Sequence, residues 1–134
     1  MEPPIAATRP ISVLLVEDET LISEWVADSL TEQGFAVQTA ANAADALRHL
    51  RSARFDVLFT DVNLAGDMDG TALARRAREI VPGLPVVYAS GRMSILDSAL
   101  RVPGSLFVAK PYDPAVVGRL LASAANAEAD HALA

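Results

Sequence analysis

Five residues of this 134-residue chain have the side-chain types that bind a divalent cation and a phosphoryl group. They are three carboxylates, a hydroxyl and an ammonium: Glu17, Asp18, Asp61, Ser90 and Lys110. Mg²⁺ prefers a few carboxylate oxygens completed by water and phosphate oxygens. A lysine ammonium and a serine hydroxyl bind phosphoryl oxygens. The set therefore suits phosphoryl transfer to a carboxylate, which depends mostly on positioning and charge neutralisation.

Each of these residues follows a short apolar run, typical of a strand buried on both faces. Strands are predicted at residues 11–16, 35–39, 55–60, 85–89 and 105–109, and helices at 20–33, 42–51, 71–81, 93–101 and 114–125. The alternation predicts an α/β fold with a doubly wound, five-stranded parallel sheet. Right-handed crossovers place all carboxyl ends of the strands at one edge, where the five residues would meet. The helix at 93–101 has little apolar surface, so we expect it to be short or mobile.

The length predicts one domain, over residues 11–125. Residues 1–10 hold three prolines and are expected to form a flexible leader, and residues 126–134 a fraying tail. We see no internal repeat and expect no separate output domain. The leader lacks the pattern of a signal peptide and no apolar run approaches a membrane span, so we expect a cytoplasmic protein.

The composition excludes several classes of site. The chain has no cysteine, which removes disulfides and thiol nucleophiles, and only two histidines, which makes a zinc site or a Ser-His arrangement improbable. The net charge of -6 opposes nonspecific binding to nucleic acid or to an anionic membrane.

Short motifs stand at the predicted strand ends and helix starts. They are VLLVEDE, FTDVNL around Asp61, MDG before the third helix, Ser90-Gly91 after the fourth strand and Lys110-Pro111 after the fifth. With these motifs in this order, the chain resembles the CheY-like response-regulator receiver domains of two-component signalling, which have a flavodoxin-like fold. Residues 87–92 and 110–112 also resemble an alphaproteobacterial subgroup of stand-alone regulators, which usually has Thr in place of Ser90.

The resemblance implies a role for each matching residue. Asp61 would accept a phosphoryl group from a histidine kinase or a histidine phosphotransfer protein. Mg²⁺ would be bound by Glu17, Asp18, Asp61 and the backbone carbonyl of Asn63. Ser90 and Lys110 would contact the phosphoryl group, and Pro111 would follow a cis peptide bond. Phe107 occupies the aromatic switch position, where the family often has tyrosine.

The resemblance therefore implies a signalling switch rather than a turnover enzyme. Phosphorylation would alter a protein-binding surface at the fifth strand and its flanking helices, in a monomer or weak dimer. The downstream partner is not named by the sequence.

Two other functions stay open. Asp67-Met68-Asp69-Gly70-Thr71 reproduces the D-x-D-G-T string of haloacid-dehalogenase-type phosphatases, which also form a phosphoaspartate. That string should directly follow a buried strand, whereas here four loop residues precede it. The other alternative is a pseudo-receiver, an interaction module that never takes phosphate.

Overall fold

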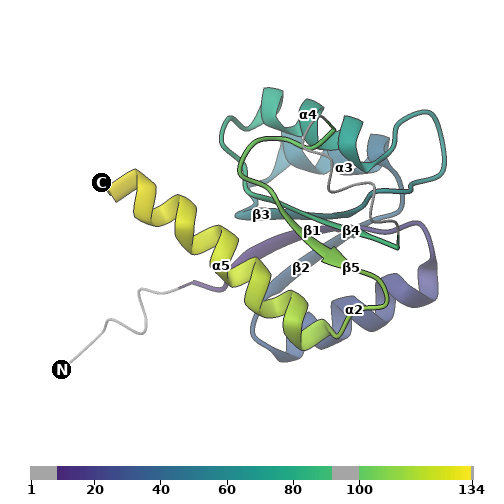
Figure 1. The fold of residues 1–134 in the computed structure, drawn as a ribbon, viewed down its shortest axis with the longest axis horizontal. Coiled ribbons are helices and arrows are strands. Elements are labelled where there is room, and N and C mark those ends of the chain that lie inside the picture. Colours follow the sequence, from purple (N-terminus) through teal and green to yellow (C-terminus); the bar gives the residue numbers. More distant parts are fainter. Residues whose placement is uncertain (1–8, 92–99, 134) are drawn as a thin grey trace.

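The computed structural model of the chain describes residues 9–91 and 100–133, with side chains as far as residue 127. Its elements, labelled as in Figure 1, are β1 (Ser12–Val16), α2 (Thr20–Glu32), β2 (Ala36–Ala40), α3 (Ala43–Ser52), β3 (Val57–Asp61), α4 (Gly70–Ile80), β4 (Val86–Ser90), β5 (Leu106–Ala109) and α5 (Pro114–Leu133). All four strand pairings are parallel, in the order β2-β1-β3-β4-β5. The predicted doubly wound parallel sheet is confirmed.

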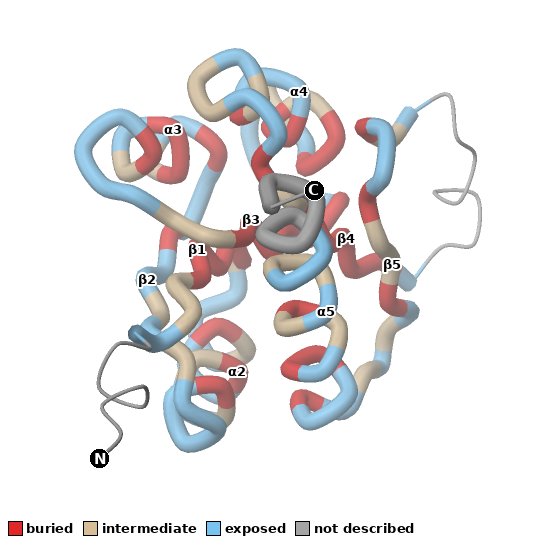
Figure 2. Tube along the Cα trace, turned by 90° about the vertical axis from the view of Figure 1, so that its left-hand side faces the viewer, coloured by how far each residue is buried: buried red, intermediate tan, exposed pale blue. Residues whose placement is uncertain are grey.

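Two layers of helices bury the two faces of the sheet. In Figure 1, α3 and α4 lie above the sheet, and α2 and α5 lie below it. Each layer closes its own apolar cluster: Leu47 and Leu73 pack into the first, Val26 and Leu121 into the second. Figure 2 shows the buried residues gathered in the strands and on the inner sides of the helices. This arrangement leaves the ends of the strands as the places where polar groups can meet solvent.

The central strands are the most apolar part of the chain, as predicted. Every residue of β3 and of β4 is buried. Asp61 and Ser90 are the last residues of these strands rather than the first residues beyond them. Their backbones are consequently held by sheet hydrogen bonding, while their side chains reach the edge of the sheet.

The C-terminal helix is longer than the sequence predicted. The predicted tail began at residue 126, but α5 continues to Leu133. The helix therefore ends later than the predicted end at residue 125. The last turns are rich in alanine, which has the highest helix propensity, and this composition favours helix.

Two predicted segments lie largely outside the described residues. They are the leader over residues 1–10, of which 1–8 are not described, and the helix at 93–101, of which 93–99 are not described.

At the start of the described chain, the Arg9 guanidinium donates two hydrogen bonds of 2.9 Å to the carboxylate of Asp56. The Ser12 amide donates to the same carboxylate at 2.8 Å. Among the described residues, no helix is long and apolar enough to cross a membrane.

Gly70 allows α4 to begin directly against the end of β3. Its amide donates to the carbonyl of Val62 at 2.8 Å. A Cβ atom at this position would lie 2.1 Å from the backbone oxygen of Asp61 and 2.9 Å from the Cα of Val62. Only glycine fits this approach, which explains the glycine of the MDG motif.

We predict that Gly70→Ala lowers the free energy of unfolding by about 1–3 kcal/mol, the usual cost of overpacking, because the obstructing atoms are backbone. The matched control is Gly91→Ala, since no described atom lies within 4 Å of a Cβ built at Gly91. Urea unfolding monitored by circular dichroism measures both. Equal stability of the two variants would contradict the assignment.

Candidate functional site

Three carboxylates meet at the carboxyl edge of the sheet. Glu17 and Asp18 follow β1, and Asp61 ends β3, the strand paired directly with β1. Each residue offers one carboxylate oxygen to a group in which all three oxygens lie within 4.8 Å of one another. Glu17 and Asp61 are buried, and Asp18 is partly exposed. The structure thus brings together the acidic residues that the sequence singled out.

Lys110 supplies the positive charge of the site. It directly follows β5, two strands from β3, and its Nζ lies 2.8 Å from Oδ2 of Asp61 and 3.7 Å from Oε1 of Glu17. Burial alone would lower the pKa of the Lys110 ammonium. The hydrogen bond to Asp61 and the charges of both carboxylates outweigh burial and raise this pKa above its usual value. Lys110 therefore stays charged beside Asp61.

One ammonium does not balance three carboxylates. Burial raises the pKa of Glu17 above its usual value, and the neighbouring charges of Asp61 and Asp18 act in the same direction. The Glu19 amide, which donates to Oε2 of Glu17 at 3.1 Å, and Lys110 oppose this rise only in part. A hard divalent cation with oxygen ligands relieves such repulsion. The donor set and its spacing fit Mg²⁺, with Glu17, Asp18 and Asp61 as the residues that would hold it.

The loop between β3 and α4 completes the surroundings of the carboxylates. The amide of Asn63 donates to Oδ1 of Asp61 at 3.2 Å, and the amide of Ala65 donates to Oδ2 of Asp18 at 2.9 Å. Each of these two carboxylates therefore has one oxygen bound to the loop. The metal-ligand role of the Asn63 carbonyl stays a prediction.

Ser90 lies on β4, between β3, which ends in Asp61, and β5, which leads to Lys110. It ends β4, which pairs with β3 on one side and β5 on the other, with Ala89 opposite Asp61 and Ser90 opposite Ala109. Ser90 is 1% exposed, and its carbonyl accepts a 2.9 Å hydrogen bond from the Lys110 amide. The Ser90 backbone therefore lies one residue beyond the partner of Asp61 and is hydrogen-bonded directly to Lys110.

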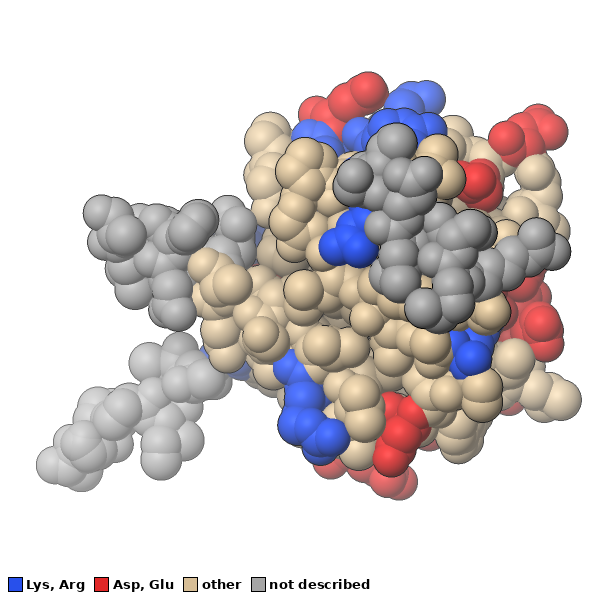
Figure 3. All heavy atoms as spheres, in the orientation of Figure 1, with Lys and Arg blue, Asp and Glu red and all other residues tan. Residues whose placement is uncertain are grey.

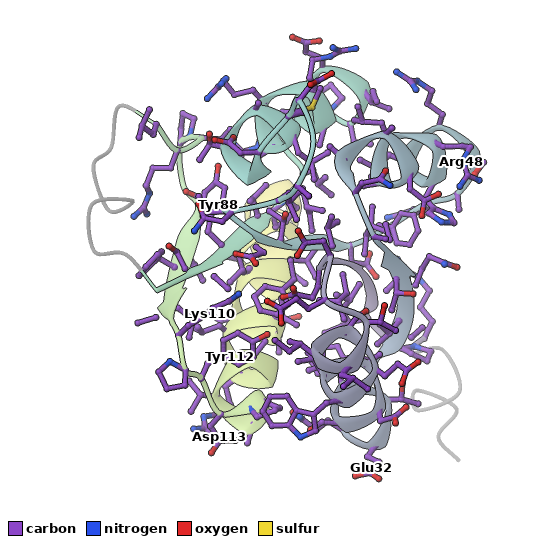
Figure 4. The ribbon with its side chains drawn as sticks, turned by 90° about the vertical axis from the view of Figure 1, so that its right-hand side faces the viewer. Glu32, Arg48, Tyr88, Lys110, Tyr112 and Asp113 are labelled. Atoms are coloured by element: carbon purple, nitrogen blue, oxygen red, sulfur yellow. The ribbon has the colours of Figure 1, made fainter. Side chains whose placement is uncertain are left out.

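Tyr112 is a site residue to which the sequence interpretation gave no role. The Lys110–Pro111 peptide bond is cis, as predicted, and Tyr112 follows it. Figure 4 shows Tyr112 close to Lys110 at the carboxyl edge. Its ring packs edge-on against Phe59, with centroids 5.8 Å apart. Burial and the charges of Glu17 and Asp61 raise the pKa of Tyr112 to about 12, so its phenol stays neutral. Its position two residues after Lys110 was the signal available in the sequence.

Phe107 and the D-x-D-G-T string lie outside the carboxylate group. Phe107 is partly buried, pairs across from Tyr88 and packs on the face covered by α3 and α4. Asp69 caps α4, where its Oδ1 accepts hydrogen bonds from the Thr71 hydroxyl at 2.7 Å and from the Ala72 amide at 2.9 Å. The string therefore begins a helix here and does not follow a strand.

We predict that Asp18→Asn weakens Mg²⁺ binding at least about tenfold, because a carboxylate ligand is lost from the group of three. Glu19→Gln, which removes a neighbouring carboxylate outside the group, should leave the affinity within about twofold. The fluorescence of Trp25, the chain's single tryptophan, measures the titration. A loss of equal size in both variants would show diffuse attraction in place of a defined site.

Comparison with known proteins agrees with this geometry. Residues 13–122 match the family "Response regulator receiver domain". The chain is 34% identical to the probable transcriptional regulatory protein TcrX of Mycobacterium tuberculosis, over 78% of this chain and 45% of TcrX. It is 37% identical to the transcriptional regulatory protein AfsQ1 of Streptomyces coelicolor, over 82% of this chain and 47% of AfsQ1. The chain thus spans less than half the length of these curated relatives.

Solved structures show the same similarity. A response regulator receiver protein from Sinorhizobium medicae superposes with a TM-score of 0.82 at 32% identity, covering 89% of this chain and 97% of the other. The chemotaxis protein CheY4 of Vibrio cholerae superposes with a TM-score of 0.76 at 26% identity, covering 86% and 98%. The subgroup suggested by residues 87–92 and 110–112 stays a prediction. Fold, site and similarity agree: the chain belongs to the response regulator receiver domain family.

Proposed function

We propose that this protein is a phosphorylation-controlled binding switch in which Asp61 takes a phosphoryl group from a histidine kinase or a histidine phosphotransfer protein. The observation that carries the proposal is the position of Asp61, 2.8 Å from Lys110 and grouped with Glu17 and Asp18 within 4.8 Å. Such a group is suited to hold a cation and a phosphoryl group side by side.

In the proposed transfer, a carboxylate oxygen of Asp61 attacks the phosphorus of a phosphohistidine. The new O–P bond forms as the P–N bond breaks, and the imidazole of the donor leaves with the electron pair. Lys110 neutralises charge on the oxygens, and the Asn63 amide holds Oδ1 of Asp61 in place. Bound Mg²⁺ would neutralise further charge on the phosphoryl oxygens.

The phosphoryl group would carry about −1.5 to −2 charges, in place of the single negative charge of the carboxylate, if an acyl phosphate behaves like other phosphoryl groups. In this proposal Lys110 and Ser90 bind its oxygens. New bonds to them would shift an existing equilibrium of the surface formed by β5 and its flanking helices, and this surface would bind a protein partner. In this role the protein is a switch and does not turn over a substrate. That it acts without contacting nucleic acid stays a prediction, because the relatives named above are transcriptional regulators.

A groove beside the acceptor suits the phosphate donor. Its volume is about 330 Å³, and its lining is Ile22, Trp25, Lys110, Pro111 and Tyr112. Trp25 is 54% exposed, so a large part of its ring is open to a partner. Because Lys110 lines both the groove and the phosphoryl site, a donor seated here would present its histidine to Asp61. We therefore assign the groove to an apolar helix face of the donor.

We predict that Trp25→Ala slows phosphorylation by a protein donor about tenfold or more, the cost of losing a buried aromatic anchor. Phosphorylation by acetyl phosphate, which needs no docking, should change less than about twofold. Phosphorylated protein separated on phosphate-affinity gels measures both reactions. Equal slowing with the two donors would place Trp25 in the chemistry or in folding.

The competing functions are separated by the choice of aspartate. Wild-type protein incubated with Mg²⁺ and either acetyl phosphate or beryllofluoride should respond, Asp61→Asn should not, and Asp67→Asn should respond like the wild type. Intact mass spectrometry detects the acyl phosphate, and ¹⁹F NMR detects bound beryllofluoride. Loss of the response in Asp67→Asn alone would favour the phosphatase. No response from any of the three proteins would favour the pseudo-receiver.

A further inference from the structure

The segment Leu100–Ser105 leads into the edge strand β5. Side chains of α4 hold it through hydrogen bonds to its backbone carbonyls. Arg75 donates to the carbonyl of Leu100 at 3.3 Å, and Arg78 donates to the carbonyl of Pro103 at 2.7 Å. Both arginines lie on α4, over which basic side chains are visible in Figure 3. These bonds recognise the path of the backbone and not any side chain of the segment.

A buried hydroxyl holds the same segment from the sheet. The amide of Val102 donates to the phenol oxygen of Tyr88 at 3.1 Å. Tyr88 is fully buried in β4, and Val102 is 5% exposed. A backbone amide buried at this position needs an acceptor, because an unsatisfied one is costly. The Tyr88 hydroxyl therefore fixes the position of this segment relative to β4.

Arg78 ties these contacts into one unit. Besides Pro103, it donates through Nε to the carbonyl of Leu84, in the turn that leads into β4. One guanidinium thus joins the start of β4 to the segment, while Tyr88 joins the middle of β4 to it. If β4 moves, either these hydrogen bonds break or the segment moves with the strand.

Strand β4 also ends in Ser90, on the same side of the strand as Tyr88, because side chains two residues apart face the same side. The aromatic residue opposite Tyr88 in β5 is Phe107, which has no hydroxyl. On this face of the sheet, Tyr88 is therefore the aromatic residue that can report a movement of β4 through a hydrogen bond.

We propose that Tyr88 and Arg78 form a latch that couples β4 to the Leu100–Ser105 segment, so that phosphorylation at Asp61 is read out on this segment. The inference rests on the proposed function, since the movement of β4 begins with Ser90 binding the phosphoryl group. The segment presents Leu100, 49% exposed, as an apolar contact beside the basic residues of α4. Its regulated partner would offer an apolar side chain flanked by acidic groups.

Amide exchange measured by NMR, with and without Mg²⁺ and beryllofluoride, tests the latch. In the wild type, beryllofluoride should change the exchange rates of the described amides between Leu100 and Ser105 by threefold or more, on the order of a shift in one hydrogen-bonded population. In Tyr88→Phe the Val102 amide should exchange about tenfold faster before any addition, because one buried hydrogen bond is lost. Beryllofluoride should still bind within about twofold of wild type, and the change over the segment should be lost.

Arg78→Ala and Arg76→Ala form a matched pair on the same helix. Arg76 pairs with Glu79, and among the described residues it donates no hydrogen bond to the segment. Arg78→Ala should reduce the beryllofluoride-dependent change, and Arg76→Ala should preserve it. This pair carries the test if Tyr88→Phe does not fold.

The outcomes separate the two proposals. If the wild type binds beryllofluoride but exchange over Leu100–Ser105 does not change, the latch is overturned and the proposed function stands. The latch is equally overturned if Tyr88→Phe or Arg78→Ala keeps the full change. If the wild type does not bind beryllofluoride at all, it is the proposed function that fails.

Discussion

The ion pair between Asp61 and Lys110 is the interaction on which the site depends. Two carboxylates buried beside each other and a third at the rim would repel strongly without a cation. Lys110 reaches across β4 to provide one, and in doing so it ties the edge strand β5 to the central strand β3. The contact therefore serves the sheet and the chemistry together. One ammonium does not neutralise three carboxylates, and the negative charge that remains favours the binding of a divalent cation.

The order of the strands makes this contact possible. Asp61 and Lys110 are 49 residues apart, yet one strand separates those that carry them. β1 brings its acidic pair to the other side of β3. No single element contains the site, so its geometry follows from the register of four strands. Any shift of one strand by a residue would turn its site residue to the opposite face.

The sequence could predict what depends on local pattern. The apolar runs predicted the strands, and the carboxylates and the lysine that end three of the runs predicted which charged side chains would meet. Features that depend on contacts between distant segments could not be predicted in this way. The lack of room for a Cβ at Gly70 is set by the backbone of Asp61, and the groove at Trp25 is also lined by Lys110, Pro111 and Tyr112 from the other end of the chain. The length of α5 was missed for another reason. Val117 and Leu121 near its start are buried, whereas the alanine-rich sequence from residue 122 onward gives no periodic apolar signal.

The burial of Asp61 also has a consequence for the lifetime of an acyl phosphate formed there. Its side chain is 6% exposed, with one oxygen bonded to Lys110 and the other to the Asn63 amide. Hydrolysis of an acyl phosphate needs a water molecule in line with the bond that breaks. Because Asp61 is buried, water could approach an acyl phosphate there from few directions. The access that remains would set how long the acyl phosphate lasts. The side chains that control the access of water to Asp61 would then set the lifetime of the phosphorylated state. The residues that accept the phosphoryl group would not set it.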